Sequence, residues 1–273
     1  MSDAAGELVP VRRAWGAIAF AGLGYFVDIF DLLLFAVLRV PSVREVAGPA
    51  ATLEVGALLQ NAQLVGMMLG GLWWGMLGDR RGRRAALYGS IALYSVANLA
   101  NALVATVPQY VVLRLVAGFG LAGELGAALT LVSEMVHPRE RGTATTLVAT
   151  LGVMGAVAAA IVGELVPWRW AYALGGAMGL VLLLLRVGLA DSAMFARTRT
   201  AGMRRGDLRT LFATRDRRLR YARSVLIGVP VWFTTGILIT FAPEFARALG
   251  VSGEVTAARA VLVFYGATTL GDL

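Results

Sequence analysis

The feature that most constrains this chain is a series of eight apolar segments, each about as long as a bilayer is thick. We place them at residues 14–38, 55–78, 85–107, 110–133, 143–166, 170–190, 224–246 and 256–273. A membrane-spanning α-helix needs about 20 predominantly apolar residues. Composition agrees, because 58% of the 273 residues are hydrophobic and only 15% are charged, against about 25% charged in soluble domains. The sequence therefore predicts an all-α membrane protein.

The connections between these segments divide the chain into two groups. Most are short turns, such as 79–84 (DRRGRR) and 137–142 (HPRERG), which force neighbouring helices to run antiparallel. The exception is the arginine-rich segment 191–223. We therefore expect a six-helix bundle over residues 1–190, a cytoplasmic linker over 191–223 and two further helices over 224–273.

The arginines fall mainly on one side of this predicted topology. With the N-terminus in the cytoplasm, nineteen arginines lie on the cytoplasmic side and five on the other, namely Arg39, Arg44, Arg169, Arg247 and Arg259. Positive residues stay on the cytoplasmic side during insertion. We therefore expect a multi-pass protein of the inner (plasma) membrane with a cytoplasmic N-terminus. The formal net charge of +8 then reflects topology and contact with anionic lipid, not nucleic-acid binding.

Composition gives little support to metal, cofactor or catalytic chemistry. The chain has no cysteine, which excludes disulfides, zinc–thiolate sites and iron–sulfur clusters. Its single histidine, His137, is placed in a cytoplasmic turn. The stretches between the apolar segments are too short for a catalytic domain. We therefore predict a protein that is not an enzyme and needs neither metal nor cofactor.

Two aspartates interrupt the first apolar segment, within 24–35 (GYFVDIFDLLLF). An ionisable residue at the centre of a membrane helix costs about 3 kcal/mol, so it usually faces a wet cavity or a partner. Asp28 and Asp31 are three residues apart and share one helix face. Two close carboxylates in a partly dry site resist being ionised together, so one could load and release a proton. We predict that both couple transport to protons; a static structural role is the alternative.

The fourth segment supplies a cation. Arg114 is the one arginine placed well inside an apolar segment, and Glu124 lies ten residues further along. Charges of both signs in the first and fourth helices indicate a polar pathway through the bundle. Arg114 would bind substrate together with Asp28 and Asp31, and Glu124 would assist proton coupling. Alternatively, Arg114 could extend to the nearby outer surface.

Glycine spacing predicts close helix packing. Gly66 with Gly70 and Gly71 with Gly75 are spaced as GxxxG, which lets helices approach closely. The run GFGLAG at 118–123 matches the dinucleotide-binding pattern, but it lies inside an apolar helix and not after a strand, so we interpret it as packing too. Five amides are expected to form helix–helix hydrogen bonds or to line polar contacts: Gln60, Asn61, Gln63, Asn98 and Asn101.

The turn after the second segment has the most specific pattern in the chain. The stretch 75–87 (GMLGDRRGRRAAL) resembles the signature loop of the major facilitator superfamily, G-x-L-(A/G/S)-D-R-x-G-R-(R/K). Asp79 is expected near a helix start, where the positive end of the dipole favours an acid. The resemblance implies a gating loop that holds the two halves together on the cytoplasmic side. Its residues would be Gly75, Gly78, Asp79, Arg80, Gly82, Arg83, Arg84 and, at the end of the fourth helix, Glu134.

Shorter stretches are similar to the metabolite:proton symporter branch of that superfamily. They are 28–32 (DIFDL), 114–124 (RLVAGFGLAGE), 168–176 (WRWAYALGG) and 191–195 (DSAMF). They depart from the branch pattern, for example with Asp28 in place of glutamate and Ala193 in place of proline. Sialic-acid, carboxylate and aromatic-acid branches of the superfamily therefore stay open.

The resemblance implies the major facilitator fold, with twelve helices in two six-helix halves. The chain would hold the N-terminal bundle and the first two helices of a C-terminal bundle, as a partial sequence or a truncated protein. The implied function is proton-coupled symport of a small organic acid or zwitterionic metabolite by alternating access, in a protein that is a monomer when complete. The alternatives are a multidrug/proton antiporter and a non-transporting membrane sensor or assembly protein.

Overall fold

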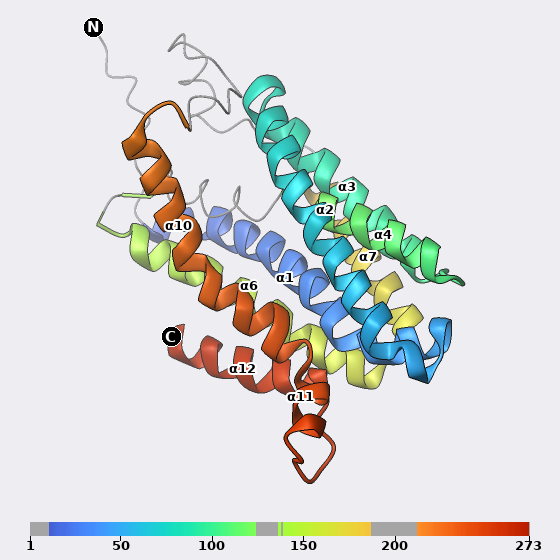
Figure 1. The fold of residues 1–273 in the computed structure, drawn as a ribbon. Helices are drawn as coiled ribbons and strands as arrows, with labels where there is room; N and C mark the ends of the chain where they lie inside the picture. Colours follow the sequence, from blue (N-terminus) through green and yellow to red (C-terminus); the bar gives the residue numbers. More distant parts are fainter. Residues whose placement is uncertain (1–10, 124–135, 138, 187–211, 273) are drawn as a thin grey trace, which may run out of the picture.

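The computed structural model describes residues 11–123, 136–137, 139–186 and 212–272, which are mostly helical (Figure 1). The N-terminal part contains α1 (Val11–Ala47), η1 (Pro49–Ala51), α2 (Thr52–Arg81), α3 (Arg83–Asn101), α4 (Val107–Leu121), α6 (Arg141–Leu165) and α7 (Trp168–Arg186). The C-terminal part contains α10 (Arg215–Phe233), the π-helix η2 (Thr234–Ile239), α11 (Ala242–Ala248) and α12 (Ala257–Asp272). The predicted all-α architecture is thus confirmed.

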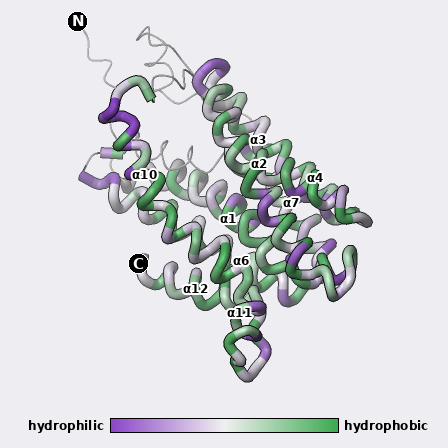
Figure 2. The backbone as a smooth tube through the Cα atoms, in the orientation of Figure 1, coloured by the Kyte–Doolittle hydropathy of each residue, from purple (hydrophilic) through white to green (hydrophobic). Residues whose placement is uncertain are grey.

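Five described helical stretches are long and apolar enough to cross a membrane: Ala21–Ala47, Pro49–Arg81, Arg141–Leu165, Trp168–Arg186 and Arg215–Ile239. The helices α4 and α12 are apolar but shorter. Figure 2 shows apolar residues along the helices and hydrophilic residues at helix ends, notably at the α2–α3 turn and in the first turns of α10. This distribution is that of a multi-pass membrane protein.

Helix α1 is the centre of the N-terminal part. It packs along α6 and also contacts α2, α4, α7 and, from the C-terminal part, α12. Its buried side chains include Phe30, Leu34, Phe35 and Leu38, which belong to the main apolar core. In lipid, such packing is driven mainly by van der Waals contact, because the surrounding hydrocarbon is as apolar as the side chains themselves.

Glycines let α2 and α4 touch. Gly66 and Gly70 lie directly against the α4 backbone, so a side chain at either position would collide with main-chain atoms. The predicted GxxxG contact is confirmed for this pair. For Gly71 and Gly75 it stays a prediction, because no described atom lies close enough to touch a side chain at either position. The two pairs have the same spacing but occupy different faces of α2.

The structure corrects the predicted end of the first helix. α1 continues through Pro41 to Ala47, beyond the predicted end at residue 38. Arg39 is therefore inside the helix and fully buried, so its placement in an outer loop is wrong. The reason is tertiary: Nη2 of Arg39 forms an ion pair with Glu244 of α11 at 2.7 Å. A partner so far along the chain leaves no local pattern.

The C-terminal part is built more loosely. α10 begins at Arg215, inside the predicted linker 191–223, because the Thr214 hydroxyl caps its first turn by accepting from the Arg217 N–H. α12 packs along α6, whereas α10 buries none of its residues within the part of the chain that the structure describes. Figure 1 shows the first turns of α10 standing apart from the α2–α3 turn. The predicted domain boundaries stay a prediction.

Candidate functional site

Both aspartates of α1 are buried inside the molecule. Asp28 and Asp31 are each 1% exposed, so neither faces the surface. Asp31 lies against α7 at Gly175, where any side chain would collide with its carboxylate oxygen Oδ1. The glycine of α7 therefore makes room for the acid of α1. Asp28 lies about one turn earlier, within electrostatic reach of Tyr25 on the same helix.

Arg114 of α4 is enclosed by aromatic rings. Its side chain is fully buried, and its guanidinium carbon lies 4.8 Å from the ring centre of Phe35 and 5.5 Å from that of Tyr172. Nη1 donates a hydrogen bond to the Tyr172 hydroxyl at 3.2 Å. The alternative in which Arg114 extends to the outer surface is therefore wrong. Desolvated cation–π contacts of this kind are worth about 2 kcal/mol or more.

Tyr172 of α7 lies between the predicted cation and one of the predicted acids. Its hydroxyl accepts from Arg114 and is within electrostatic reach of Asp31. Three helices, α1, α4 and α7, thus gather a buried carboxylate and a buried guanidinium around one phenol. The structure brings Asp31 and Arg114 into one neighbourhood, while the roles assigned to them stay predictions.

A row of hydroxyl groups continues from this neighbourhood. The Tyr172 hydroxyl is 2.7 Å from that of Tyr110, which is 2.9 Å from Oγ of Ser42. Ser42 donates to the Leu38 carbonyl, so Tyr110 must donate to Ser42 and Tyr172 to Tyr110. The Tyr172 oxygen is thereby left to accept from Arg114. Neither tyrosine is among the predicted site residues, although a buried tyrosine hydroxyl in an apolar segment indicates a polar partner.

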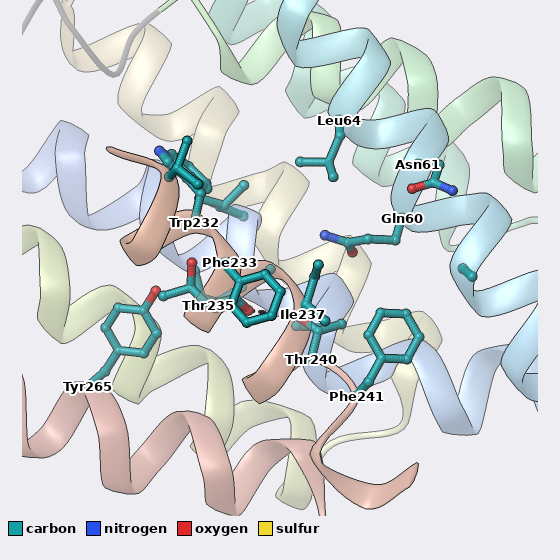
Figure 3. A pocket seen from close by; sticks show the side chains of 16 residues that line it. Gln60, Asn61, Leu64, Trp232, Phe233, Thr235, Ile237, Thr240, Phe241 and Tyr265 are labelled. Carbon is teal, nitrogen blue, oxygen red and sulfur yellow. Dashed lines mark hydrogen bonds between the residues drawn. The ribbon is translucent and has the colours of Figure 1, made fainter. Parts of the chain in front are cut away.

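A cavity of about 550 Å³ lies between the two parts of the chain (Figure 3). Helices α1 and α2 form one wall, and α10, η2 and α12 form the other. Figure 3 shows Gln60 reaching from α2 towards η2 and the Tyr265 hydroxyl directed at Thr235. The lining is mostly apolar with a few polar groups, which is typical of small-molecule sites.

The cavity and the charged neighbourhood lie on different sides of α1. The described lining contains neither aspartate nor Arg114. Leu32 and Leu33 are among the α1 residues in the wall, whereas Asp31 faces α7. Asp28 is four residues before Leu32 and so lies on the same helix face, one turn away. Asp28 therefore borders the cavity without lining it, whereas Asp31 faces away from the cavity.

The C-terminal wall of the cavity is an irregular helix. After Phe233, α10 continues as the π-helix η2, and the Thr240 hydroxyl donates to the Thr235 carbonyl at 3.0 Å. π-Helical turns are frequent at functional sites. None of these residues is among the predicted site residues. The available signal is the interruption of an apolar segment by Pro230 and Gly236, which in transporters indicates a binding site.

The predicted amides divide between two locations. Gln60 and Asn61 line the cavity, whereas Gln63, Asn98 and Asn101 are buried between helices of the N-terminal part. The amide nitrogen of Asn101 bonds the Ala97 carbonyl of its own helix at 2.8 Å. A contribution to polar lining is therefore confirmed for the first two.

The predicted gating loop forms the turn between α2 and α3. Gly82 has a φ of 102°, a conformation that favours glycine. Asp79 and Arg80 are exposed in the last turn of α2, so the expectation of Asp79 near a helix start is wrong. Glu124 and Glu134 lie outside the described residues. The rest of the loop, Gly75, Gly78, Arg83 and Arg84, lies at the end of α2 and the start of α3.

Two curated relatives are transporters of aromatic acids by name. The chain is 38% identical over 157 residues to a 3-(3-hydroxy-phenyl)propionate transporter of Escherichia coli, which covers 56% of this chain and 38% of that protein. It is 30% identical over 198 residues to a 4-hydroxybenzoate transporter of Pseudomonas putida, which covers 70% of this chain and 43% of that protein. The matched region thus spans less than half the length of either relative.

A solved structure and a family model cover more of the chain. A xylose transporter of E. coli, in a partially occluded inward-open conformation, has a TM-score of 0.68 at 17% identity, covering 94% of this chain and 70% of that one. At this identity the likeness shows the fold alone. The model of the Major Facilitator Superfamily matches residues 14–271. Together with the signature loop between α2 and α3, this match shows that the chain belongs to the Major Facilitator Superfamily.

Proposed function

We propose that the chain is part of a secondary active transporter that couples proton movement to symport of a small aromatic carboxylic acid across the inner membrane. The observation that carries the proposal is Arg114, buried between Phe35 and Tyr172 with Asp31 nearby. A guanidinium pairs with a carboxylate in a planar, charge-assisted geometry, and aromatic rings pack well against a flat aromatic body. The names of the two relatives favour the aromatic-acid branch among those that the sequence leaves open.

Electrostatic repulsion would couple the proton to the substrate. An ionised Asp31 and a substrate carboxylate at Arg114 would be like charges close together in a buried site. Protonation of Asp31 removes this repulsion, so proton binding and carboxylate binding favour each other. Asp28, about one turn away and closer to the cavity wall, would pass the proton on. Binding the proton and the substrate on one side of the membrane and releasing both on the other side is symport.

The cavity would supply the route to this site. Its volume of about 550 Å³ falls within the usual range for small-molecule sites, about 300–1,000 Å³. Because α1 stands between the cavity and Arg114, we propose that the substrate reaches the arginine when α1 shifts during alternating access. The gating loop 75–84, with Asp79 and Arg83, would control closure on the cytoplasmic side, as predicted from the resemblance.

Transport into proteoliposomes tests this proposal. The longest reading frame that contains the chain should accumulate labelled 4-hydroxybenzoate when the outside is more acidic, and a protonophore should abolish the accumulation. Asp31→Asn should reduce accumulation to the level of empty vesicles. The matched control is Asp216→Asn, which changes an exposed acid that pairs with Arg220 on its own helix and should leave transport unchanged.

Two results would contradict the proposal. Accumulation that ignores the proton gradient, or that survives in Asp31→Asn, would remove the coupling role of this acid. Gradient-driven efflux of unrelated cationic dyes, without uptake of aromatic acids, would favour the multidrug antiporter instead. Arg114→Lys separates charge from shape, because lysine keeps the charge but loses the planar fork, and it should raise the KM for the aromatic acid.

A further inference from the structure

One buried ion pair joins the two parts of the chain. Arg39 of α1 holds Glu244 of α11, with Nη2 2.8 Å from Oε1 and 2.7 Å from Oε2. The Arg39 side chain is fully buried, and that of Glu244 is 19% exposed. Removing one partner of such a pair is strongly unfavourable, because the other charge stays buried without compensation.

Two further contacts of the Arg39 guanidinium come from the same short segment of the C-terminal part. Nη2 also donates to the Thr240 carbonyl at 3.1 Å, and the guanidinium carbon lies 4.2 Å from the ring centre of Phe241. Residues 240–244 therefore supply the hydrogen bonds, the ion pair and the ring contact of the Arg39 guanidinium. A movement of this segment away from α1 would break all of these contacts at once. On the opposite side, Gly56 of α2 leaves space for the arginine, since a side chain there would crowd it.

This segment is also a wall of the cavity. Thr240 and Phe241 both hold Arg39 and line the cavity (Figure 3). Separation of α11 from α1 would therefore open the cavity at this end. A second ion pair across the two parts, between Arg259 of α12 and Glu164 of α6, is longer at 3.9 Å and more exposed, so its electrostatic contribution is small.

We propose that Arg39 and Glu244 form a latch that closes the cavity where α1 meets α11, and that the cavity opens at this end when the pair separates. The purpose of the latch rests on the proposed transport function, in which this end is the outer one, opposite the gating loop 75–84. In that function, the latch holds the outer side closed while the cytoplasmic side is open.

An ion pair near the same end provides a matched control. Glu45 of α1 and Arg169 of α7 are 3.0 Å apart, and both belong to the N-terminal part. Arg169 also donates to the carbonyls of Ala102 and Val104, just after α3. This pair also joins a carboxylate to a guanidinium, but it is more exposed than the latch and links helices that stay together when the two parts separate.

Distances between spin labels in the purified chain test the latch. The sequence has no cysteine, so introduced pairs carry all the label. Leu58 of α2 and Leu249 after α11 report across the latch, whereas Leu58 and Leu165 of α6 report within the N-terminal part; all three side chains are exposed. With Glu244 intact, the first pair should show a main short distance and a minor long one.

Glu244→Gln should raise the share of the long distance about tenfold, because a buried arginine loses its counter-charge. The distance from Leu58 to Leu165 should not change, which shows that the N-terminal part is still folded. Phe241→Leu keeps the ion pair but removes the ring contact with Arg39, and it should raise the share of the long distance by a smaller factor, about threefold. Glu45→Gln should leave the share across the latch unchanged.

Three outcomes would overturn the latch. They are unchanged distances in Glu244→Gln, an equal rise in Glu45→Gln, and a long distance that is absent while Glu244 is intact. The measurement uses neither substrate nor proton gradient. The latch proposal can therefore be confirmed when the transport proposal is contradicted, and it can be contradicted when transport is observed.

Discussion

Helices α1 and α10 begin the two parts of the chain, and both are apolar enough to span a membrane. α1 nevertheless buries Asp28, Asp31 and Arg39, whereas α10 buries none of its residues in the described chain and leaves Leu226 and Ile227 71% and 77% exposed. Apolar composition therefore does not by itself create a site. Charge is tolerated inside a membrane helix only where neighbouring helices supply partners, and α1 has such neighbours in α4, α7 and α11.

The largest expected effect comes from truncating a buried apolar side chain of α1. Leu34 is fully buried, so Leu34→Ala should lower the free energy of unfolding by about 2–5 kcal/mol through the cavity that it leaves. Leu226→Ala, the same change on α10, should stay within about 0.5 kcal/mol. Unfolding of the chain in mixed detergent micelles with increasing SDS gives both values. Equal losses would contradict the contrast between the two helices.

Removing one hydroxyl beside Arg114 should have the next largest effect. Tyr172→Phe takes the acceptor from the arginine and the donor from Tyr110, and bonds to charged groups are worth about 1.5–3 kcal/mol. The control is Tyr265→Phe in the C-terminal part, where the hydroxyl bonds the neutral side chain of Thr235, and we expect about 1 kcal/mol there. The same SDS titration distinguishes them, and an equal loss would mean that the charge of Arg114 adds nothing.

Adding a methyl group at a glycine between helices should give a smaller difference in stability between the N-terminal and C-terminal parts. Gly155 of α6 lies against the backbone of Phe26 in α1, so Gly155→Ala forces the helices apart and should cost about 1–3 kcal/mol. Gly236 of η2 has no described atom close enough to meet a side chain, so Gly236→Ala should cause no loss. Thermal unfolding followed by tryptophan fluorescence measures both changes. A loss at Gly236 would reveal close packing on the C-terminal side.

The smallest expected effect is local to α10. Thr214→Ala removes the hydroxyl that caps the helix, worth about 1 kcal/mol. Because the described chain buries no residue of α10, amide hydrogen exchange should rise about fivefold in its first turn. Exchange in α1 should not change. Faster exchange in α1 as well would show that the two helices unfold as one unit.

Much of the membrane architecture and part of the candidate site could be predicted. The lengths of the apolar segments predicted most helices, because the bilayer fixes the length of a crossing independently of the neighbours. Burial of Asp28, Asp31 and Arg114 was predictable for a related reason, since a charge in the middle of such a segment must face inward. Their proton and substrate roles stay predictions.

The errors arise where a distant contact decides the outcome. Arg39 resembles a loop residue at the end of an apolar segment, but Glu244, more than 200 positions further along, makes its burial possible. Spacing alone also does not decide which glycines pack, because Gly66 and Gly71 begin equally good GxxxG pairs, yet among the described residues only the face that carries Gly66 meets α4.

The sequence by itself determined the membrane class, the order of the helices, the superfamily resemblance and the presence of buried charge, because these follow from local hydropathy and from one short motif. Only the tertiary structure decided which charges meet, how the hydroxyl row leads to Arg114, and where the cavity lies. Those features depend on the rotation and crossing of helices far apart in the chain, and the free energy of a buried charge depends on the partner that such packing provides.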